Sequence, residues 1–256
     1  MDENEFDFEN RIMSSSYDPQ ETENENTLRP QTLDEYIGQE HLVGPGAVLR
    51  RMIDGGKISS FILWGPPGVG KTTLAHIISQ QLQAPFFTLS AVQSGVKEGR
   101  EVIDRCKANI FSKVRPILFI DEIHLIAGAG AAEGAIDAAS ILKPMLARGE
   151  IQLIGATTPE EYRKTIQKDS ALERRFGRVM VEEPTPAAAE TILAGLMPRY
   201  ERYHGVSIPP EAIHAAVELS VRYLPGRYLP DKAIDLLDEA AAARRIADAS
   251  GNRRAL

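Results

Sequence analysis

The residues with the clearest chemical potential occupy positions 65–72, where the sequence is Gly-Pro-Pro-Gly-Val-Gly-Lys-Thr. An apolar run at 61–64 precedes them and an apolar helical pattern at 73–82 follows, flanks that a chance glycine-rich turn would lack. In this context the backbone N–H groups and the helix start can surround a β-phosphate. We expect Lys71 to reach the β- and γ-phosphates and the Thr72 hydroxyl to hold Mg²⁺. The predicted nucleotide-binding residues of this loop are Pro66, Pro67, Gly68, Val69, Gly70, Lys71, Thr72 and Thr73.

Two adjacent carboxylates follow a second apolar run, Ile-Leu-Phe-Ile at 117–120. Asp121 would hold Mg²⁺, largely through the water shell of the ion, and Glu122 would act as general base on an attacking water. The alternative is a buried strand that ends in a solvated acidic turn. Because a phosphate loop lies about 50 residues upstream, we favour the catalytic interpretation.

A hydroxyl pair, Thr157 and Thr158, closes the next apolar run in the sequence Gly-Ala-Thr-Thr. A hydroxyl at a strand tip beside the acidic pair can orient the attacking water and sense the γ-phosphate. A threonine at a strand end is also a typical helix cap, so this motif gains its weight from its order after the first two.

The fourth candidate is the segment Ala-Leu-Glu-Arg-Arg-Phe at 171–176. Phosphoryl transfer develops negative charge, and an arginine supplied by a neighbouring subunit can stabilise it. A solvated helix end that carries Lys168, Arg174 and Arg175 is the alternative, and spacing alone leaves both possibilities open.

These motifs lie on alternating predicted strands and helices, which indicates an α/β domain with a parallel sheet covered on both faces. The expected strands are 61–64, 86–89, 116–120, 151–154 and 178–181, and the expected helices are 42–54, 72–82, 98–109 and 136–147. After Pro184 and Pro186 the pattern becomes purely helical, at 187–204, 210–223 and 230–247. We therefore expect a nucleotide-binding domain at 28–183, a small helical domain at 184–250 packed on it, and a flexible C-terminus at 251–256.

Composition and charge narrow the function classes. The chain has 256 residues, 43% of them hydrophobic, and its single cysteine cannot form an intrachain disulfide, which favours a reducing, cytoplasmic setting. No apolar run approaches the length of a membrane span, so we expect no membrane association. Residues 1–26 have a net charge of −8, and we predict a disordered acidic tail at 1–27. The rest of the chain is close to neutral, which gives no bulk argument for nucleic-acid binding.

The order of the motifs resembles that of the AAA+ ATPase superfamily, over nearly everything from Leu28 to Ala247. The sequence Leu-Arg-Pro at 28–30, followed by Tyr-Ile-Gly-Gln at 36–39, resembles the box on the adenine side of that superfamily's site and places Ile37 and Gly38 at the nucleotide. The resemblance implies that Thr158 is the sensor-one residue and that Arg174 and Arg175 are arginine fingers facing a neighbour's ATP. It also implies a helical lid, with Pro230 and Lys232 at the sensor-two position, and a homo-oligomeric ring, expected to be a hexamer.

Within the superfamily the chain is mixed. Residues 28–124 resemble the replication-associated recombination protein A family (RarA/MgsA), and residues 125–247 resemble the first ATPase module of Clp unfoldases such as ClpB and ClpC. Clp modules grip polypeptide with an aromatic pore residue, whereas the corresponding segment here, 94–99, has none; the second pore segment, 128–134, is present.

We therefore predict a cytoplasmic, Mg²⁺-dependent ATPase of the AAA+ class with ATP as its cofactor. The favoured function is Clp-like remodelling of an unfolded protein. A DNA-associated ATPase of replication, recombination or repair is the first alternative, and a regulatory ATP-binding scaffold is the second.

Overall fold

The computed structural model describes residues 30–56, 58–90, 96–109, 115–127, 148, 151–169 and 173–252. A five-stranded sheet forms its first part, in the order β2-β3-β4-β1-β5. All four strand pairings are parallel, so the predicted fold class is confirmed. The strands are β1 (Phe61–Trp64), β2 (Phe86–Ser90), β3 (Ile117–Asp121), β4 (Gln152–Thr157) and β5 (Gly177–Met180).

Side chains of the central strands alternate between two apolar cores, as expected for a sheet covered on both faces. Phe61 and Leu63 join the core formed with α4 (Val48–Asp54) and α5 (Lys71–Gln81). Ile62, between them, joins the second core with Ile103 of α6 (Val96–Ala108) and Tyr162 of α9 (Pro159–Lys164). The carboxyl ends of β1, β3 and β4 therefore meet at one edge of a rigid three-layered domain.

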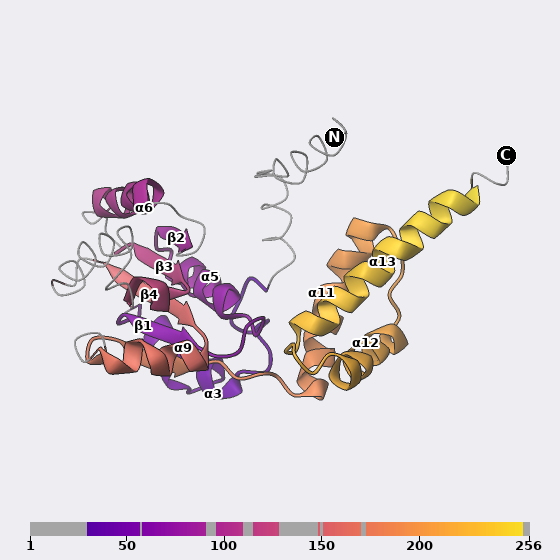
Figure 1. Cartoon of the computed structure of the whole chain (residues 1–256), viewed down its shortest axis with the longest axis horizontal. Helices are drawn as coiled ribbons and strands as arrows, with labels where there is room; N and C mark the ends of the chain where they lie inside the picture. Colours follow the sequence, from indigo (N-terminus) through magenta and orange to yellow (C-terminus); the bar gives the residue numbers. More distant parts are fainter. Residues whose placement is uncertain are drawn as a thin grey trace, which may run out of the picture.

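The three helices of the lid lie together, apart from the sheet (Figure 1). They form a third hydrophobic core of their own. The lid helices are α11 (Pro186–His204), α12 (Pro210–Tyr223) and α13 (Asp231–Asn252). Leu193, Val217 and Leu237, one from each helix, are all buried in that core. Thr185 caps α11 by accepting a hydrogen bond from the N–H of Ala188, with Pro186 in the first turn, a combination that favours a helix start.

The predicted elements differ from the observed ones mainly at their ends. The single helix expected at 42–54 is two helices, α3 (Glu40–Val43) and α4, because Gly-Pro-Gly at 44–46 interrupts it. Strand β4 continues to Thr157, three residues beyond the prediction. The short helices α7 (Ile123–Ala127), α9 and η1 (Ile166–Lys168) were not predicted. The expected helix at 136–147 and the segment 128–134 lie outside the described residues.

Candidate nucleotide-binding site

The phosphate loop links the end of β1 to the start of α5. Gly68 and Gly70 have φ angles of +74° and +91°, a region that residues with a Cβ atom rarely enter, and Gly70 is the N-cap of α5. Lys71 follows in the first turn of that helix, and its Nζ donates to the carbonyl oxygens of Gly65 at 3.0 Å and Pro66 at 2.6 Å. The loop therefore curls around its own lysine and directs backbone N–H groups and the positive helix end to one point.

Burial lowers the pKa of the Lys71 ammonium from its usual 10.5 to about 8, while the nearby carboxylate of Asp121 acts in the opposite direction. A partly desolvated cation interacts strongly with an incoming anion, because folding has already removed much of the water around the cation. The electrostatics of the loop thus suit a phosphate group.

The acidic pair lies where β3 ends. Asp121 is the last residue of the strand, and its Oδ1 accepts a hydrogen bond from the backbone N–H of Glu122 at 3.1 Å. Glu122 has a φ of +53°, a left-handed conformation that is uncommon for a residue with a side chain, and it is exposed. Such local strain is concentrated at functional sites, where it re-aims a side chain. Here it turns the chain sharply between the strand and α7.

The two threonines after β4 have different surroundings. Thr157 is 3% exposed, and its Oγ1 lies 3.1 Å from Nδ1 of His124. Thr158 is the N-cap of α9, and its Oγ1 accepts a hydrogen bond from the backbone N–H of Glu161 at 3.3 Å. The hydroxyl of Thr158 therefore caps a helix, and the residue also lines the pocket, so its role as the sensor residue stays a prediction.

The box on the adenine side joins the phosphate loop to the segment before the lid. The hydroxyl of Tyr36 donates to the carbonyl oxygen of Gly70 at 3.2 Å, and burial raises the pKa of that phenol. Gln39, 2% exposed, donates to the carbonyl oxygen of Glu182 at 2.6 Å and accepts from its N–H at 3.2 Å. Gly38 has a φ of +86°, and a Cβ atom there would lie 3.3 Å from Cβ of Pro184. The adenine-side box therefore contacts both the phosphate loop and the segment that leads to the lid.

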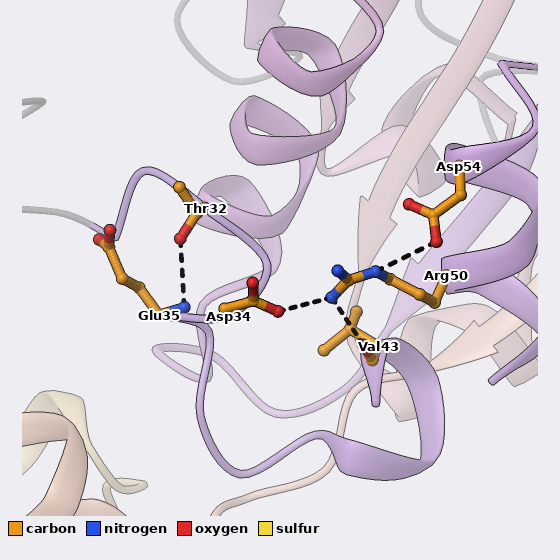
Figure 2. Close-up of polar contacts among 6 residues, drawn as sticks. All are labelled: Thr32, Asp34, Glu35, Val43, Arg50 and Asp54. Atoms are coloured by element: carbon orange, nitrogen blue, oxygen red, sulfur yellow. Dashed lines mark hydrogen bonds and ion pairs between the residues drawn. The ribbon is translucent and has the colours of Figure 1, made fainter. Parts of the chain in front are cut away.

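An arginine fixes the same box to α4 (Figure 2). Arg50 forms ion pairs with Asp34 at 2.8 Å and with Asp54 at 3.3 Å, and one of its guanidinium nitrogens lies 3.5 Å from the carbonyl oxygen of Val43. In the same view Oγ1 of Thr32 accepts a hydrogen bond from the N–H of Glu35. These contacts hold residues 32–36 in a turn that delivers Tyr36 to the loop.

The lid closes the pocket from the opposite side. A Cβ atom placed on Gly68 would lie 2.5 Å from Cβ of Asp231, so the first turn of α13 rests directly on the phosphate loop. The carboxylate of Glu183 accepts a hydrogen bond from the N–H of Leu229 at 2.8 Å and so anchors the turn before α13. The resulting pocket has a volume of about 510 Å³, within the usual range for small-molecule sites.

Most of the predicted nucleotide-binding and catalytic residues line this pocket. They are Ile37, Pro67, Gly68, Val69, Gly70, Lys71, Thr72, Thr73, Asp121, Glu122, Thr158 and Pro230. Gly38 and Pro66 do not line it. Other lining residues were not among the predicted site residues: Tyr36 and Thr157, which belong to motifs seen in the sequence, and His124, Asp231 and Asp235. His124 stands two residues after Glu122, and Thr157 stands next to Thr158, so proximity to a motif was the available signal for both.

Three predicted residues lie elsewhere. Lys232 is 5% exposed and directs its Nζ to the carbonyl oxygen of Leu224, at 3.5 Å, because the helical rotation that brings Asp231 to the loop turns Lys232 away from it. Arg174 and Arg175 are exposed, before β5, and do not line the pocket of their own chain. That position is compatible with a role toward a neighbouring subunit.

Across the described ranges, no cluster of three or more His, Cys, Asp or Glu side chains is arranged to hold a metal ion. The same part of the chain contains no helix long and apolar enough to cross a membrane.

Two family models match the chain. Residues 61–182 match the ATPase family associated with various cellular activities (AAA), and residues 185–255 match an AAA lid domain. The boundary between the matches falls in the segment that Gln39 and Glu183 anchor.

Curated relatives include the chaperone protein ClpB of Aquifex aeolicus, 50% identical over 200 residues, which are 72% of this chain and 20% of the relative. The negative regulator of genetic competence ClpC/MecB of Bacillus subtilis is 49% identical over 201 residues, which are 72% of this chain and 25% of the relative. The chain therefore spans about a quarter or less of the length of these relatives.

Among solved structures, the closed state of Hsp104 with ATPγS and FITC-casein is similar with a TM-score of 0.71 and 35% identity, over 90% of this chain and 41% of that one. The extended conformation of the Saccharomyces cerevisiae Hsp104:casein complex has a TM-score of 0.64 at 36% identity, over 80% of this chain and 38% of that one.

Proposed function

This chain belongs to the AAA+ ATPase family and is homologous to the Clp unfoldases, and we propose that it hydrolyses ATP to remodel a protein substrate. The family prediction made from the motifs is confirmed, whereas the resemblance of residues 28–124 to the RarA family stays a prediction. One observation carries the proposal: the phosphate loop, the acidic pair, the tip of β4 and the lid all face a single pocket.

The residues of the pocket fit ATP and Mg²⁺. The loop offers N–H groups and the charged Lys71 to the phosphates, and Ile37, Pro184 and Ile192 offer an apolar wall away from them. The Thr72 hydroxyl and the Asp121 carboxylate are oxygen ligands of the kind that Mg²⁺ prefers. When bound, the ion would neutralise charge on the β- and γ-phosphates. Glu122 would take the proton from the attacking water.

We propose that Arg174 and Arg175 act on the ATP of a neighbouring copy, in a homo-oligomeric ring that we expect to be hexameric. Both side chains are exposed and outside their own pocket, as an arginine finger requires. Replacing Arg174 by Ala should lower ATPase activity in the assembled state without weakening ATP binding. Unchanged activity of the assembled variant would remove Arg174 from this role.

Protein is favoured over DNA as the substrate. The relatives named above include a chaperone, and both Hsp104 structures contain casein. The sequence beyond residue 26 is also close to neutral, which offers no bulk attraction to phosphate backbones. Titrating the ATPase with unfolded casein and, in parallel, with single-stranded DNA tests this part: stimulation by DNA alone would overturn it in favour of the replication and repair alternative.

The hydrolytic role of the pocket is tested with Glu122→Gln in the full chain. The amide cannot accept the proton, so turnover should fall by about 10²-fold or more while ATP binding persists. Glu160→Gln is the matched control, because Glu160 is exposed on α9, pairs with Lys164 at 2.6 Å and does not line the pocket. Normal turnover by Glu122→Gln, or absence of turnover in the wild-type chain, would contradict the proposal.

A further inference from the structure

His124 connects the two strand ends that carry the proposed chemistry. It lies in the first half of α7, directly beyond the acidic pair, and its side chain is 13% exposed at the wall of the pocket. Its Nδ1 is 3.1 Å from Oγ1 of Thr157, and its Nε2 is 4.0 Å from Oε2 of Glu161 on α9. The imidazole therefore spans from the end of β3 to the end of β4 and the helix that follows.

The neighbour of each ring nitrogen indicates which one carries the proton. The carboxylate of Glu161, 4.0 Å from Nε2, favours the tautomer with its proton on that side, and in this tautomer Nδ1 is an acceptor. The Thr157 hydroxyl would then donate the 3.1 Å hydrogen bond, with its only proton directed at the imidazole. The oxygen of Thr157 then keeps both lone pairs, and the residue lines the pocket.

Thr158, by contrast, is bonded to the backbone. Its oxygen accepts the N–H of Glu161 at the start of α9, the helix that holds Glu161 near His124. The two adjacent hydroxyls thus have different partners: that of Thr158 caps α9, and that of Thr157 contacts His124.

We propose that His124 is a positioning residue for hydrolysis, which fixes the Thr157 hydroxyl so that its oxygen accepts a hydrogen from the attacking water. This inference rests on the proposed ATPase function. In that reaction the water oxygen bonds to the γ-phosphorus, the bond from the γ-phosphorus to the β,γ-bridging oxygen breaks, and ADP leaves with the bridging oxygen. Glu122 receives one proton of the water, while the other O–H is aligned by Thr157.

The test measures kcat, KM and ATP affinity of the full chain for His124→Ala, His124→Asn and the control His41→Ala, an exposed histidine on α3 that does not line the pocket. His124→Ala should lower kcat about 10–100-fold, with ATP affinity within about twofold of wild type, because positioning acts on the reacting geometry and not on binding. His124→Asn should recover most of the loss, since its amide oxygen can occupy the place of Nδ1 and accept the same hydrogen bond.

A second pair of variants keeps the proposal testable if His124→Ala folds poorly. Thr157→Val is nearly isosteric, and it should lower kcat as His124→Ala does, whereas Thr157→Ser, which keeps a hydroxyl, should retain a higher kcat than Thr157→Val. Combining His124→Ala with Thr157→Val should lower kcat no further than either change alone, because both remove the same hydrogen bond. Independent, multiplicative losses would overturn the pairing of the two residues.

Failure of the proposed ATPase function and failure of the role of His124 give different results. A wild-type chain without turnover would overturn the proposed function and this inference with it. A wild-type chain with turnover, together with a kcat for His124→Ala within twofold of wild type or an Asn variant no better than Ala, would overturn the role of His124 alone.

Discussion

The buried charge of Lys71 destabilises the folded state, and replacing Lys71 by an uncharged residue should therefore raise the free energy of unfolding. Burial lowers its pKa from 10.5 to about 8. At about 1.4 kcal/mol for each tenfold change in acid strength, the charge costs the fold about 3 kcal/mol at pH 7. Lys71→Met removes the charge and keeps most of the volume, but it leaves the carbonyl groups of Gly65 and Pro66 without their donor, which costs about 1–2 kcal/mol. The net expectation is a gain of about 1–2 kcal/mol in stability, or about 2–8 °C in Tm, with loss of nucleotide affinity.

The gain should depend on pH in a defined direction. The folded-state pKa of Lys71 lies below that of the unfolded chain, so the unfolded state binds more protons between pH 8 and 10.5. The penalty is therefore complete below pH 8 and fades as the pH rises toward 10.5. The stability gain of the variant should shrink over this range and then reverse, because the neutral amine of Lys71 still donates to the carbonyl groups of Gly65 and Pro66. Comparing the two proteins at each pH cancels the titration of all other groups.

Urea unfolding of the full chain measures this gain. Trp64 is the only tryptophan and stacks on Tyr162 at 5.3 Å between ring centres, so its fluorescence reports on the sheet domain. Lys164→Met is the control: that lysine is exposed, its hydrogen bond with Glu160 raises its pKa, and its loss should bring no gain. A Lys71→Met variant less stable than wild type at pH 7, or a stability difference that is the same at pH 7 and pH 10, would refute the reasoning.

Three further predictions follow from the pocket. ATP affinity of the wild-type chain, measured with a fluorescent analogue, should fall by up to about tenfold per pH unit above pH 8, where free Lys71 loses its proton; constant affinity from pH 7 to 9.5 would contradict this. Gly68→Ala should lower Tm and ATP affinity, because a φ of +74° costs a residue with a Cβ atom about 1–2 kcal/mol and the new methyl would meet Asp231; an unchanged Tm would contradict the contact between loop and lid. Gln39→Ala should cost about 1–3 kcal/mol of stability by removing two part-buried hydrogen bonds to the backbone of Glu182, and Gln39→Glu should not restore it, because a carboxylate cannot donate to the Glu182 carbonyl; denaturant midpoints of the two variants decide this.

The phosphate loop and the acidic pair were predictable because their chemistry is local. Each is a short run of residues attached to a strand whose apolar pattern is visible in the sequence, and a parallel sheet brings strand ends to one edge. The interruption of the helix at 42–54 was also visible in Gly-Pro-Gly at 44–46, but the apolar periodicity on both sides obscured it. The end of β4 and the start of α9 depend on whether Thr157 or Thr158 is the last residue of the strand. The periodicity of apolar residues does not distinguish these two possibilities.

The contacts of the lid could not be predicted in the same way. Asp231 contacts Gly68, although the two residues are far apart in the sequence. The rotation of α13 about its axis that brings Asp231 to the loop also directs Lys232 to the carbonyl of Leu224. A change of one residue in helical register would exchange these two side chains, and the sequence around Pro230 is compatible with either. Tyr36 poses the same problem, because its hydrogen bond to Gly70 depends on a turn fixed by Arg50.

The last helix has a mechanical consequence that follows from where it starts. At about 1.5 Å per residue, the 22 residues of α13 form a rod about 33 Å long, with Asp231 on the phosphate loop and Asn252 at the far end (Figure 1). Glu183 accepts the N–H of Leu229, just before the inner end of this rod. A rotation of the lid by about 10° around this segment would move Asp231 only slightly but would carry the distal end of α13 through about 6 Å. An element joined to the distal end of α13 would then move farther than Asp231 does at the phosphate loop.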